Sequence, residues 1–293
     1  MRVTSDFLGD LLRPAAAAPK QPTSRERAAA NRLGVLRAVA AHGHLRCADL
    51  GAACWLGARY GLQMAQRTVR GLVEAGELLA RRNAHGSVSY VLTRPGAAAL
   101  ELHGVPARHG LDLASVSGPT YAHHALTSRW CLHRQAQGFE AWSEHALVNG
   151  YAPATAQQLL ARFHKMPDAV VIKGTRLRLV ETESAPKATP ELVRIVSLAE
   201  HVGQRVNAAL PYTLAGVVVL FDATLNQAAR VAKAARERWG HRSAADQAVL
   251  ASRVALARAD IGLPLVWRGC TEASLTLRSA AGAAPERQLL VQV

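Results

Sequence analysis

The 293 residues of the chain are enough for about two domains, and 49% of them are hydrophobic, so each domain can bury a core. Its four cysteines, Cys47, Cys54, Cys131 and Cys270, form no CxxC pair, which excludes zinc-finger spacing and argues against a disulfide framework. The longest apolar stretch, Tyr212–Phe221, is about half the length that spans a bilayer, and no signal peptide is visible. We therefore expect a cytoplasmic protein with reduced thiols and no membrane partner.

Basic side chains outnumber acidic ones along the whole chain. Lys and Arg number 35 against 21 Asp and Glu, which gives a formal charge of +14. Residues 1–116 carry 15 basic and 8 acidic side chains, and the remainder carries 20 and 13. Both halves therefore favour a polyanionic partner, for which nucleic acid is the usual example. A generally basic surface without a specific ligand is the alternative explanation.

Helical spacing begins after residues 1–24, which we expect to form a flexible arm. A first helix is predicted from about residue 25 to Gly43, where the glycine ends it, and a second over Cys47–Cys54. A third is predicted from about residue 59 to residue 74. Its expected apolar members are Leu62, Met64, Val69, Leu72 and Val73.

A hairpin and a fourth helix follow. The strand-like runs Glu77–Arg82 and Ser87–Leu92 flank a tetrapeptide with Asn83 and Gly86, which tolerate the positive φ of a tight turn. A helix at Pro95–His103 then closes a unit that we predict to span residues 25–104.

This order of elements resembles a winged helix-turn-helix domain. In that family the third helix enters the major groove of duplex DNA, and the hairpin, called the wing, touches an adjacent groove or the backbone. The resemblance therefore implies double-stranded DNA as a partner. It assigns DNA contacts to the outward side of the third helix and to the wing tip, namely Gln63, Gln66, Arg67, Arg70, Arg81, Arg82 and His85. A winged helix that contacts protein, with these side chains solvated, is the alternative.

Residues 105–119 are punctuated by Pro, Gly and Ser and predict a linker, after which residues 120–293 show a different pattern. Helices are expected at Tyr121–Gln137, Pro190–Ala209, Leu225–Trp239 and Ala244–Ala259. Strands are expected at Ala141–Val148, Ala169–Ile172, Leu177–Glu183, Leu214–Phe221 and Leu263–Arg268, with a loop before the second of them. Strands that alternate with helices predict an α/β domain with a mixed sheet.

Acidic residues stand at the ends of two of these strands. Asp168 opens one strand, and Glu181 and Glu183 close the next, pointing to the same side because strand side chains alternate. Hairpin pairing of the two strands would bring Asp168 close to both. Converging carboxylates repel one another unless a cation neutralises them, and oxygen ligands select Mg²⁺ or Mn²⁺. The alternative is an exposed strand end whose acids pair with Arg176 and Arg178.

Pro167-Asp168 followed by Glu181-x-Glu183 resembles the PD-(D/E)xK nuclease superfamily, and Glu144 matches an additional upstream acid of many members. The resemblance implies a restriction-endonuclease-like domain with Glu144, Asp168 and Glu181 as metal ligands. The pattern usually has Lys where this chain has Glu183. Lys187 is the candidate relocated lysine, and Lys165 and Lys173 also lie nearby in the sequence.

The larger order of motifs resembles the replication-relaxation and mobilisation relaxase family of plasmids and conjugative elements. It comprises the winged helix, a helix with His124-Ala125-Leu126, then Trp142-Ser143-Glu144, Pro167-Asp168 and Glu181-x-Glu183, and covers most of residues 25–210. The resemblance implies binding to an origin of transfer or replication, with metal-dependent nicking of one strand. Other mobilisation or replication proteins and a second copy of the chain are partners that it allows. A catalytically inactive accessory factor or transcription regulator is the alternative.

Two further groups are weaker candidates. His123 and His124 lie on a predicted helix, where a structural histidine is the commoner role. The helix at residues 225–239 carries Arg230, Lys233 and Arg236 at steps of three, which suits contacts with DNA phosphates or a plain solvated face.

Overall fold

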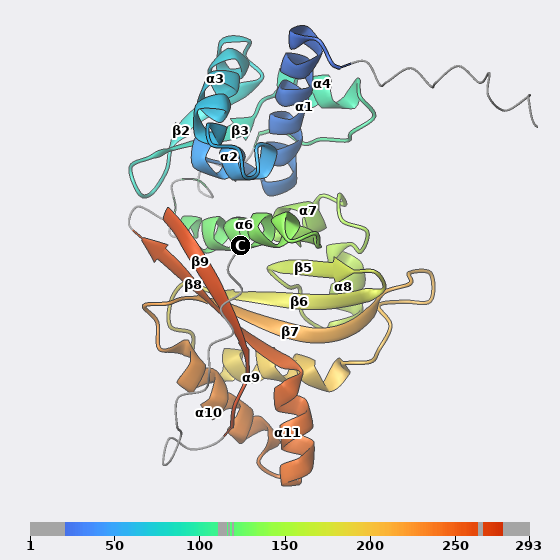
Figure 1. The fold of residues 1–293 in the computed structure, drawn as a ribbon. Coiled ribbons are helices and arrows are strands. Elements are labelled where there is room, and N and C mark those ends of the chain that lie inside the picture. Colours follow the sequence, from blue (N-terminus) through green and yellow to red (C-terminus); the bar gives the residue numbers. More distant parts are fainter. Residues whose placement is uncertain (1–20, 111–115, 117, 119, 263–265, 278–293) are drawn as a thin grey trace, which may run out of the picture.

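The computed structural model describes residues 21–110, 116, 118, 120–262 and 266–277, and it shows a mixed α/β protein. A helical unit with a small sheet stands at one end of the molecule, above a larger unit built on a curled sheet (Figure 1). Most of the arm predicted for residues 1–24, parts of the predicted linker and the start of the predicted last strand lie outside the described residues.

The N-terminal unit starts with α1 (Ser24–His42), which Thr23 caps through a reciprocal pair of hydrogen bonds with Glu26. Gly43 follows with a φ of 77°, a conformation that favours glycine, and ends the helix. The remaining elements are β1 (His44–Leu45), α2 (Cys47–Cys54), α3 (Gly61–Glu74), β2 (Leu78–Arg82), β3 (Val88–Leu92) and α4 (Arg94–Glu101). Their strands form an antiparallel sheet in the order β1-β3-β2.

Each helix contributes the residues of one side to the core of this unit. Ala65, Val69 and Leu72 of α3 pack in it with Leu36 and Val39 of α1. The prediction that Leu62 and Met64 belong to the apolar side of this helix is wrong, because 46% and 37% of these residues are exposed. The helix turns its small residues Gly61 and Ala65 inward instead, so Leu62 and Met64 lie on the outer side.

The C-terminal unit is built on a six-stranded sheet. Its strands are β4 (Glu140–Ser143), β5 (Ala169–Lys173), β6 (Arg176–Glu183), β7 (Thr213–Asp222), β8 (Val254–Gly262) and β9 (Val266–Ser274). They lie side by side in chain order, with β6, β7 and β8 parallel and the other neighbours antiparallel. Its helices are α6 (Tyr121–Ala136), α7 (Glu144–Val148), α8 (Ala156–Phe163), α9 (Thr189–Ser197), the 3-10 turn η2 (Leu198–His201), α10 (Gln227–Trp239) and α11 (Ala244–Ser252).

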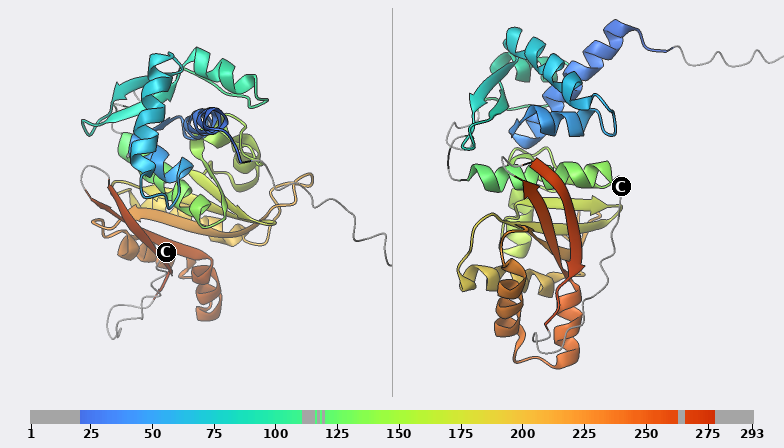
Figure 2. Two further views of the ribbon diagram at one scale, coloured as in Figure 1. Left: turned by 45° about the horizontal axis from the view of Figure 1, so that its top comes forward. Right: turned by 60° about the vertical axis from the view of Figure 1, so that its left-hand side comes forward.

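Helices cover both faces of this sheet, as the views in Figure 2 show. On one face α6 packs Leu126 and Trp130 against alternate residues of the strands, such as Val180 and Val218. On the other face α9 and α10 pack against the intervening residues. Strands buried on both faces explain the continuous apolar run in β7.

Four predicted elements of this unit need correction. The strand predicted over Ala141–Val148 ends at Ser143, whose hydroxyl caps α7, so Glu144 begins a helix. The helix predicted to Ala209 stops at Ser197, followed by η2 up to His201. The loop predicted before β5 contains α8, and the helix predicted to Ala259 ends at Ser252, where β8 begins two residues later.

The two units meet through polar side chains. Buried Asp49 of α2 pairs with Arg46 and with Arg129 of α6. The side-chain amide of Asn83, in the β2–β3 turn, donates to the Tyr121 hydroxyl at 2.9 Å, and His44 stacks on the Tyr121 ring. Within the described part of the chain, no helix has the length and apolar character that a bilayer crossing requires.

Candidate functional site

The predicted acids meet at one end of the large sheet. Asp168 immediately precedes β5, and Glu181 and Glu183 are at the end of β6, which pairs antiparallel with β5. Both glutamates are fully buried (0% exposed) and lie on the same face of the strand as Leu177 and Leu179. The alternative prediction, that these acids pair with Arg176 and Arg178, is wrong. Both arginines lie toward the opposite end of the strand, and Arg178 pairs with Glu272.

Asp168 is held by two neighbouring elements. Its carboxylate accepts a hydrogen bond from the backbone N–H of Thr182 at 2.7 Å, and Nε2 of His123 on α6 lies 3.1 Å from its Oδ1. His123 therefore belongs to the site, because it contacts Asp168. Its position in the sequence alone did not indicate this. Glu144 joins from α7: its backbone N–H donates to the Asp168 carbonyl, and its carboxylate is 3.7 Å from His124 Nδ1.

A lysine faces each buried glutamate. The Lys165 ammonium is 2.5 Å from Glu181 Oε2, and the Lys187 ammonium is 2.9 Å from Glu183 Oε1. Lys187, the candidate relocated lysine, therefore lies next to Glu183 at this end of the sheet. Lys173, the third candidate, is at the far end of β5.

Burial and mutual repulsion shape the protonation of these acids. Burial, together with the charge of Asp168, raises the pKa of Glu181 to about 8 and raises the pKa of Glu144 as well. Burial also raises the pKa of Glu183, although Lys187 opposes the shift. For Asp168 burial is outweighed by His123 and the Thr182 N–H, which lower its pKa. Asp168 is thus the acid held ionised, and Glu181 is the one whose protonated form is favoured at neutral pH.

The donor chemistry of this cluster suits a hard divalent cation. The candidate ligands Glu144, Asp168 and Glu181 offer oxygen atoms, and the buried Oε1 of Glu181 has no hydrogen-bond partner among the described residues. Among the described residues, no group of three or more Asp, Glu, His or Cys side chains is arranged so that it could hold a metal ion as it stands. A cation at Glu181 would take the place now held by the Lys165 ammonium.

A hollow of about 510 Å³ opens beside these lysines, between the end of α8 and α9. Its charged lining residues are Lys165, Lys187, Arg194 and the acid Glu191, and His201 lines it as well. His164, another lining residue, ends α8 with a φ of 57°, the left-handed conformation that caps a helix. Three cations therefore face a space next to the acids, where a phosphate group could enter.

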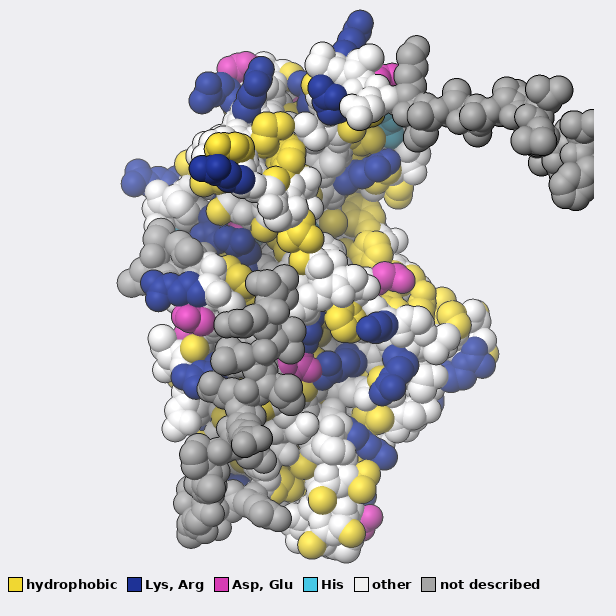
Figure 3. All heavy atoms as spheres, viewed as in Figure 1, with side chains coloured by type: hydrophobic (Ala, Val, Ile, Leu, Met, Phe, Trp, Pro, Cys, Tyr) yellow, Lys and Arg dark blue, Asp and Glu magenta, His cyan; other side chains and the backbone are white. Residues whose placement is uncertain are grey.

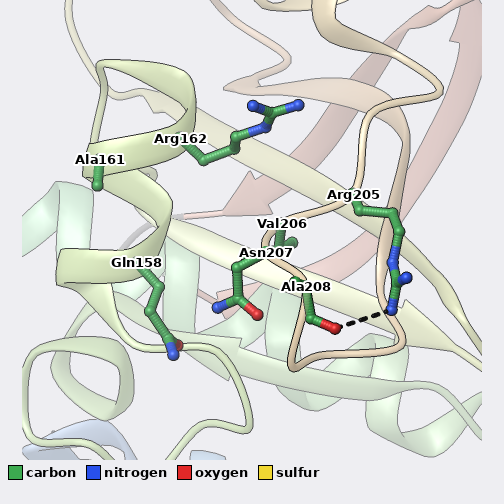
Figure 4. Close-up of a pocket in the computed structure, with 7 residues that line it drawn as sticks. All are labelled: Gln158, Ala161, Arg162, Arg205, Val206, Asn207 and Ala208. Atoms are coloured by element: carbon green, nitrogen blue, oxygen red, sulfur yellow. Dashed lines mark hydrogen bonds between the residues drawn. The ribbon is translucent and has the colours of Figure 1, made fainter.

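A separate hollow of about 540 Å³ between α8 and residues 205–208 offers no comparable chemistry (Figure 4). Its lining includes Arg162 and Arg205, and the Arg205 guanidinium is already bound to the carbonyls of Ala208 and Leu210.

The outer side of α3 carries the residues predicted to contact DNA. Gln63, Gln66, Arg67 and Arg70 are all exposed, and the exposed parts of Leu62 and Met64 lie among them. In the β2–β3 turn region Arg82 and His85 are exposed, whereas Arg81 is half-buried. Figure 3 shows Lys and Arg side chains spread over this end of the molecule.

Of the three basic residues predicted to contact phosphates from α10, two are exposed and one is held by other contacts. Lys233 and Arg236 are exposed, but the Arg230 guanidinium contacts the Lys187 carbonyl and the Gln227 side chain. Arg230 thereby holds the loop that carries Lys187, a role in shaping the acid site that the sequence pattern did not indicate.

Comparison of the chain with known protein families, with curated proteins and with solved structures finds no match.

Proposed function

We propose that this protein binds duplex DNA through its N-terminal unit, acting as a winged helix, and cleaves one strand at the acid cluster of a nuclease-like C-terminal unit. The DNA would be an origin of transfer or replication of a mobile element. The observation that carries the proposal is the convergence of Asp168, Glu181 and Glu183 at one sheet end, each glutamate facing a lysine.

The N-terminal unit supports the DNA-binding part. Three helices followed by a hairpin, with the hairpin strands completing a small sheet, give α3 an outer side of Gln and Arg residues. Gln pairs with adenine and Arg with guanine in the major groove, and both reach phosphates. The overall charge of +14 adds a sequence-independent attraction to the DNA backbone.

The order of elements around the acids supports the nuclease-like part. The unit starts with a helix (α6) and three antiparallel strands (β4, β5, β6), with α7 and α8 between the first two strands. A crossover helix (α9) and a parallel strand (β7) follow, and the acids lie at the carboxyl end of β6. In open α/β sheets this is the end where ligands bind. Lys187, which contacts Glu183, would take the role of the lysine that the sequence pattern lacks at position 183.

Hydrolysis would add water to a phosphodiester and break one P–O bond, leaving a phosphate monoester and a hydroxyl at the nick. Glu144, Asp168 and Glu181 would hold Mg²⁺ or Mn²⁺, which supplies charge stabilisation and an activated water. Lys187 and Lys165 would bind and orient the phosphate from the adjoining hollow. His123 would keep Asp168 ionised and in place.

The test uses a supercoiled plasmid that carries the DNA flanking the protein's own gene, with Mn²⁺ or Mg²⁺. We expect nicking by the wild type and by Glu101→Gln, a control substitution at an exposed acid of α4, and none by Asp168→Asn or Glu181→Gln. The two inactive variants should bind duplex DNA as tightly as the wild type, because α3 lies in the other unit.

A second candidate is a DNA-binding factor without cleavage activity. It is favoured by the two ion pairs, in which Lys165 and Lys187 already neutralise the buried glutamates without a metal. DNA binding with no nicking, and no binding of Mn²⁺ in calorimetry, would establish this candidate in place of the enzyme.

A further inference from the structure

A second basic hollow lies on the large sheet, toward the opposite end of β6 from the acids. It has a volume of about 370 Å³ and is lined by Lys173, Arg176, Arg178 and Arg253, with the Phe139 ring beside them. Lys173 ends β5 and Arg176 begins β6, on either side of the turn, whereas Glu183 ends β6. At the rise of an extended strand, Arg176 lies roughly 20 Å along β6 from Glu183, and Arg178 lies roughly 10 Å from Glu181 with its side chain on the opposite face of the strand.

The hollow exists because the sheet has no large side chain at its floor. The pairing of β6 with β7 shifts between Leu177 and Arg178, so that Ala215 is an extra residue and Gly216 lies opposite Arg178. A Cβ atom at Gly216 would lie 3.0 Å from the Arg253 carbonyl oxygen and 3.7 Å from Nε of Arg178. Glycine thus leaves open a space beside Arg178, while the Arg253 guanidinium donates to the Ala199 carbonyl at 3.2 Å, so Lys173, Arg176 and Arg178 are the cations that remain to face an anion.

Positive charge in this hollow is only partly compensated. Glu272 is the acid in contact with it, and its carboxylate is shared between Arg178, at 2.7 Å, and Arg134 of α6. Burial and the charges of Arg134 and Arg176 lower the pKa of Arg178 to about 10. Lys173 and Arg176 are exposed and form no ion pair among the described residues; the Lys173 ammonium lies over the Phe139 ring, 5.0 Å from its centre. A cluster of like charges of this kind is relieved by an anion.

Phosphate is the anion that this arrangement fits best. Guanidinium groups bind phosphate oxygens through two parallel N–H donors, and an ammonium group adds a point charge. Figure 3 shows that Lys and Arg side chains are also frequent over the middle of the molecule, around the sheet. A polyanion that follows the surface would therefore meet further cations.

We propose that the hollow lined by Lys173, Arg176 and Arg178 is a phosphate-binding site, separate from the acid cluster. Its phosphate comes either from the backbone of bound DNA or from a free phosphate compound. The first source rests on the proposed function, since it requires DNA on the protein; the second does not.

The test is the double substitution Lys173→Ala/Arg176→Ala in the full chain. A charge-matched control, Arg162→Ala/Arg268→Ala, removes two exposed arginines outside the hollow. A second variant, Lys173→Arg/Arg176→Lys, keeps both charges. Thermal unfolding verifies that each variant is folded, calorimetry measures binding of inorganic pyrophosphate, and fluorescence anisotropy measures binding of a duplex at several salt concentrations.

We expect the alanine variant to bind pyrophosphate at least tenfold more weakly than the control, and the charge-keeping variant to stay within a few-fold of the wild type. If DNA supplies the phosphate, the slope of log Kd against log salt also falls by about one to two, one lost contact per unit. Weaker pyrophosphate binding with an unchanged slope supports the free-phosphate source.

The site is rejected if the alanine variant equals the control in both measurements. If the wild type binds no DNA, the proposed function fails but pyrophosphate binding still decides on the hollow. Failure of the two ideas is thus distinguishable.

Discussion

Glu183 and Lys187 show how a buried carboxylate can obtain its counter-charge from the loop that follows its strand. Glu183 is fully buried at the end of β6, where an unpaired carboxylate would be costly. The chain turns after β6 and returns Lys187 to within 2.9 Å of it. Two side chains of α10 fix this turn, since Gln227 donates to the Ala185 carbonyl and Arg230 contacts the Lys187 carbonyl.

Removing this lysine should therefore destabilise the fold. Lys187→Met leaves Glu183 buried without its cation, and we expect a loss of about 2 kcal/mol in the free energy of unfolding at pH 7, below the cost of breaking a fully buried pair because Lys187 is partly exposed. Glu183→Gln/Lys187→Met should recover most of the loss. Urea unfolding of the wild type and the variants measures both effects. A single variant as stable as the wild type would show that the pair contributes nothing.

Leu62 and Met64 lead to a prediction about DNA sequence preference. They are exposed apolar side chains among Gln63, Gln66 and Arg67 on α3, and a major groove offers apolar contact only at the thymine methyl group. If α3 reads the groove, duplexes selected from a random library should bind several-fold more weakly once uracil replaces thymine. Leu62→Ala/Met64→Ala should abolish that difference. Equal affinity of the wild type for both duplexes would remove these residues from base contact.

At the scale of elements, the sequence predicted best where a boundary carries its own signal. Gly43, and the turn from Asn83 to Gly86, mark chain reversals that the structure contains at those positions. The end of β4 could not be seen, because Ala146 and Leu147 suit a strand as well as a helix and only the cap by Ser143 decides. The exposure of Leu62 and Met64 depends on how α3 is rotated against α1, which is a matter of tertiary packing.

The acid cluster likewise combines residues that the local sequence predicts with residues that only the tertiary fold brings together. Asp168, Glu181 and Glu183 could be predicted because strand pairing follows from the short turn between β5 and β6. His123 and Arg230 could not, since each reaches the site from a helix distant in the sequence. Lys165 was recognisable only as a neighbour in the chain, and its contact with Glu181 needed the fold.

The close packing of α4 on β2 gives a prediction at this scale. A Cβ atom at Gly96 would lie 2.1 Å from the Glu77 carbonyl oxygen, so Gly96→Ala must push the helix away. We expect a loss of stability on the order of 1–3 kcal/mol, as for other overpacked sites. Gly71→Ala is the matched control, because its nearest neighbour is 4.0 Å away and the same change within α3 should stabilise by about 0.5–1 kcal/mol. Thermal unfolding compares the two, and effects of equal sign would contradict the packing argument.

At the scale of the whole molecule, the junction of the two units is built from histidines and other polar groups. His42 and His44 are buried where α1 and β1 meet α6 and α7, and the Ser143 hydroxyl donates to the Ala41 carbonyl across the junction at 2.9 Å. Nδ1 of His42 and Nε2 of His44 have no hydrogen-bond partner among the described residues. Acid should therefore weaken this junction, since protonation would place charges in a buried site where Asp49 only partly offsets them.

Stability should accordingly fall as the pH is lowered. Burial, with a smaller contribution from neighbouring histidines, lowers the pKa of both His42 and His44 to about 4, against about 6.5 in the unfolded chain. Below pH 6.5 the unfolded chain takes up protons that the folded protein does not, so the free energy of unfolding drops until about pH 4 and then levels off. The full shift corresponds to about 3 kcal/mol per histidine.

Urea unfolding at pH 7, 6, 5 and 4.5 measures this dependence. His42→Gln/His44→Gln should lose much of the drop between pH 6.5 and 4.5, because glutamine does not titrate. His103→Gln/His109→Gln, which changes two exposed histidines, should keep the drop of the wild type. The comparison between the two double variants isolates the buried pair from the acids that titrate in the same range. If both variants follow the wild type, His42 and His44 are not the source of acid sensitivity. The groups to examine are then His145, whose pKa burial also lowers to about 4, and the carboxylates around Asp168.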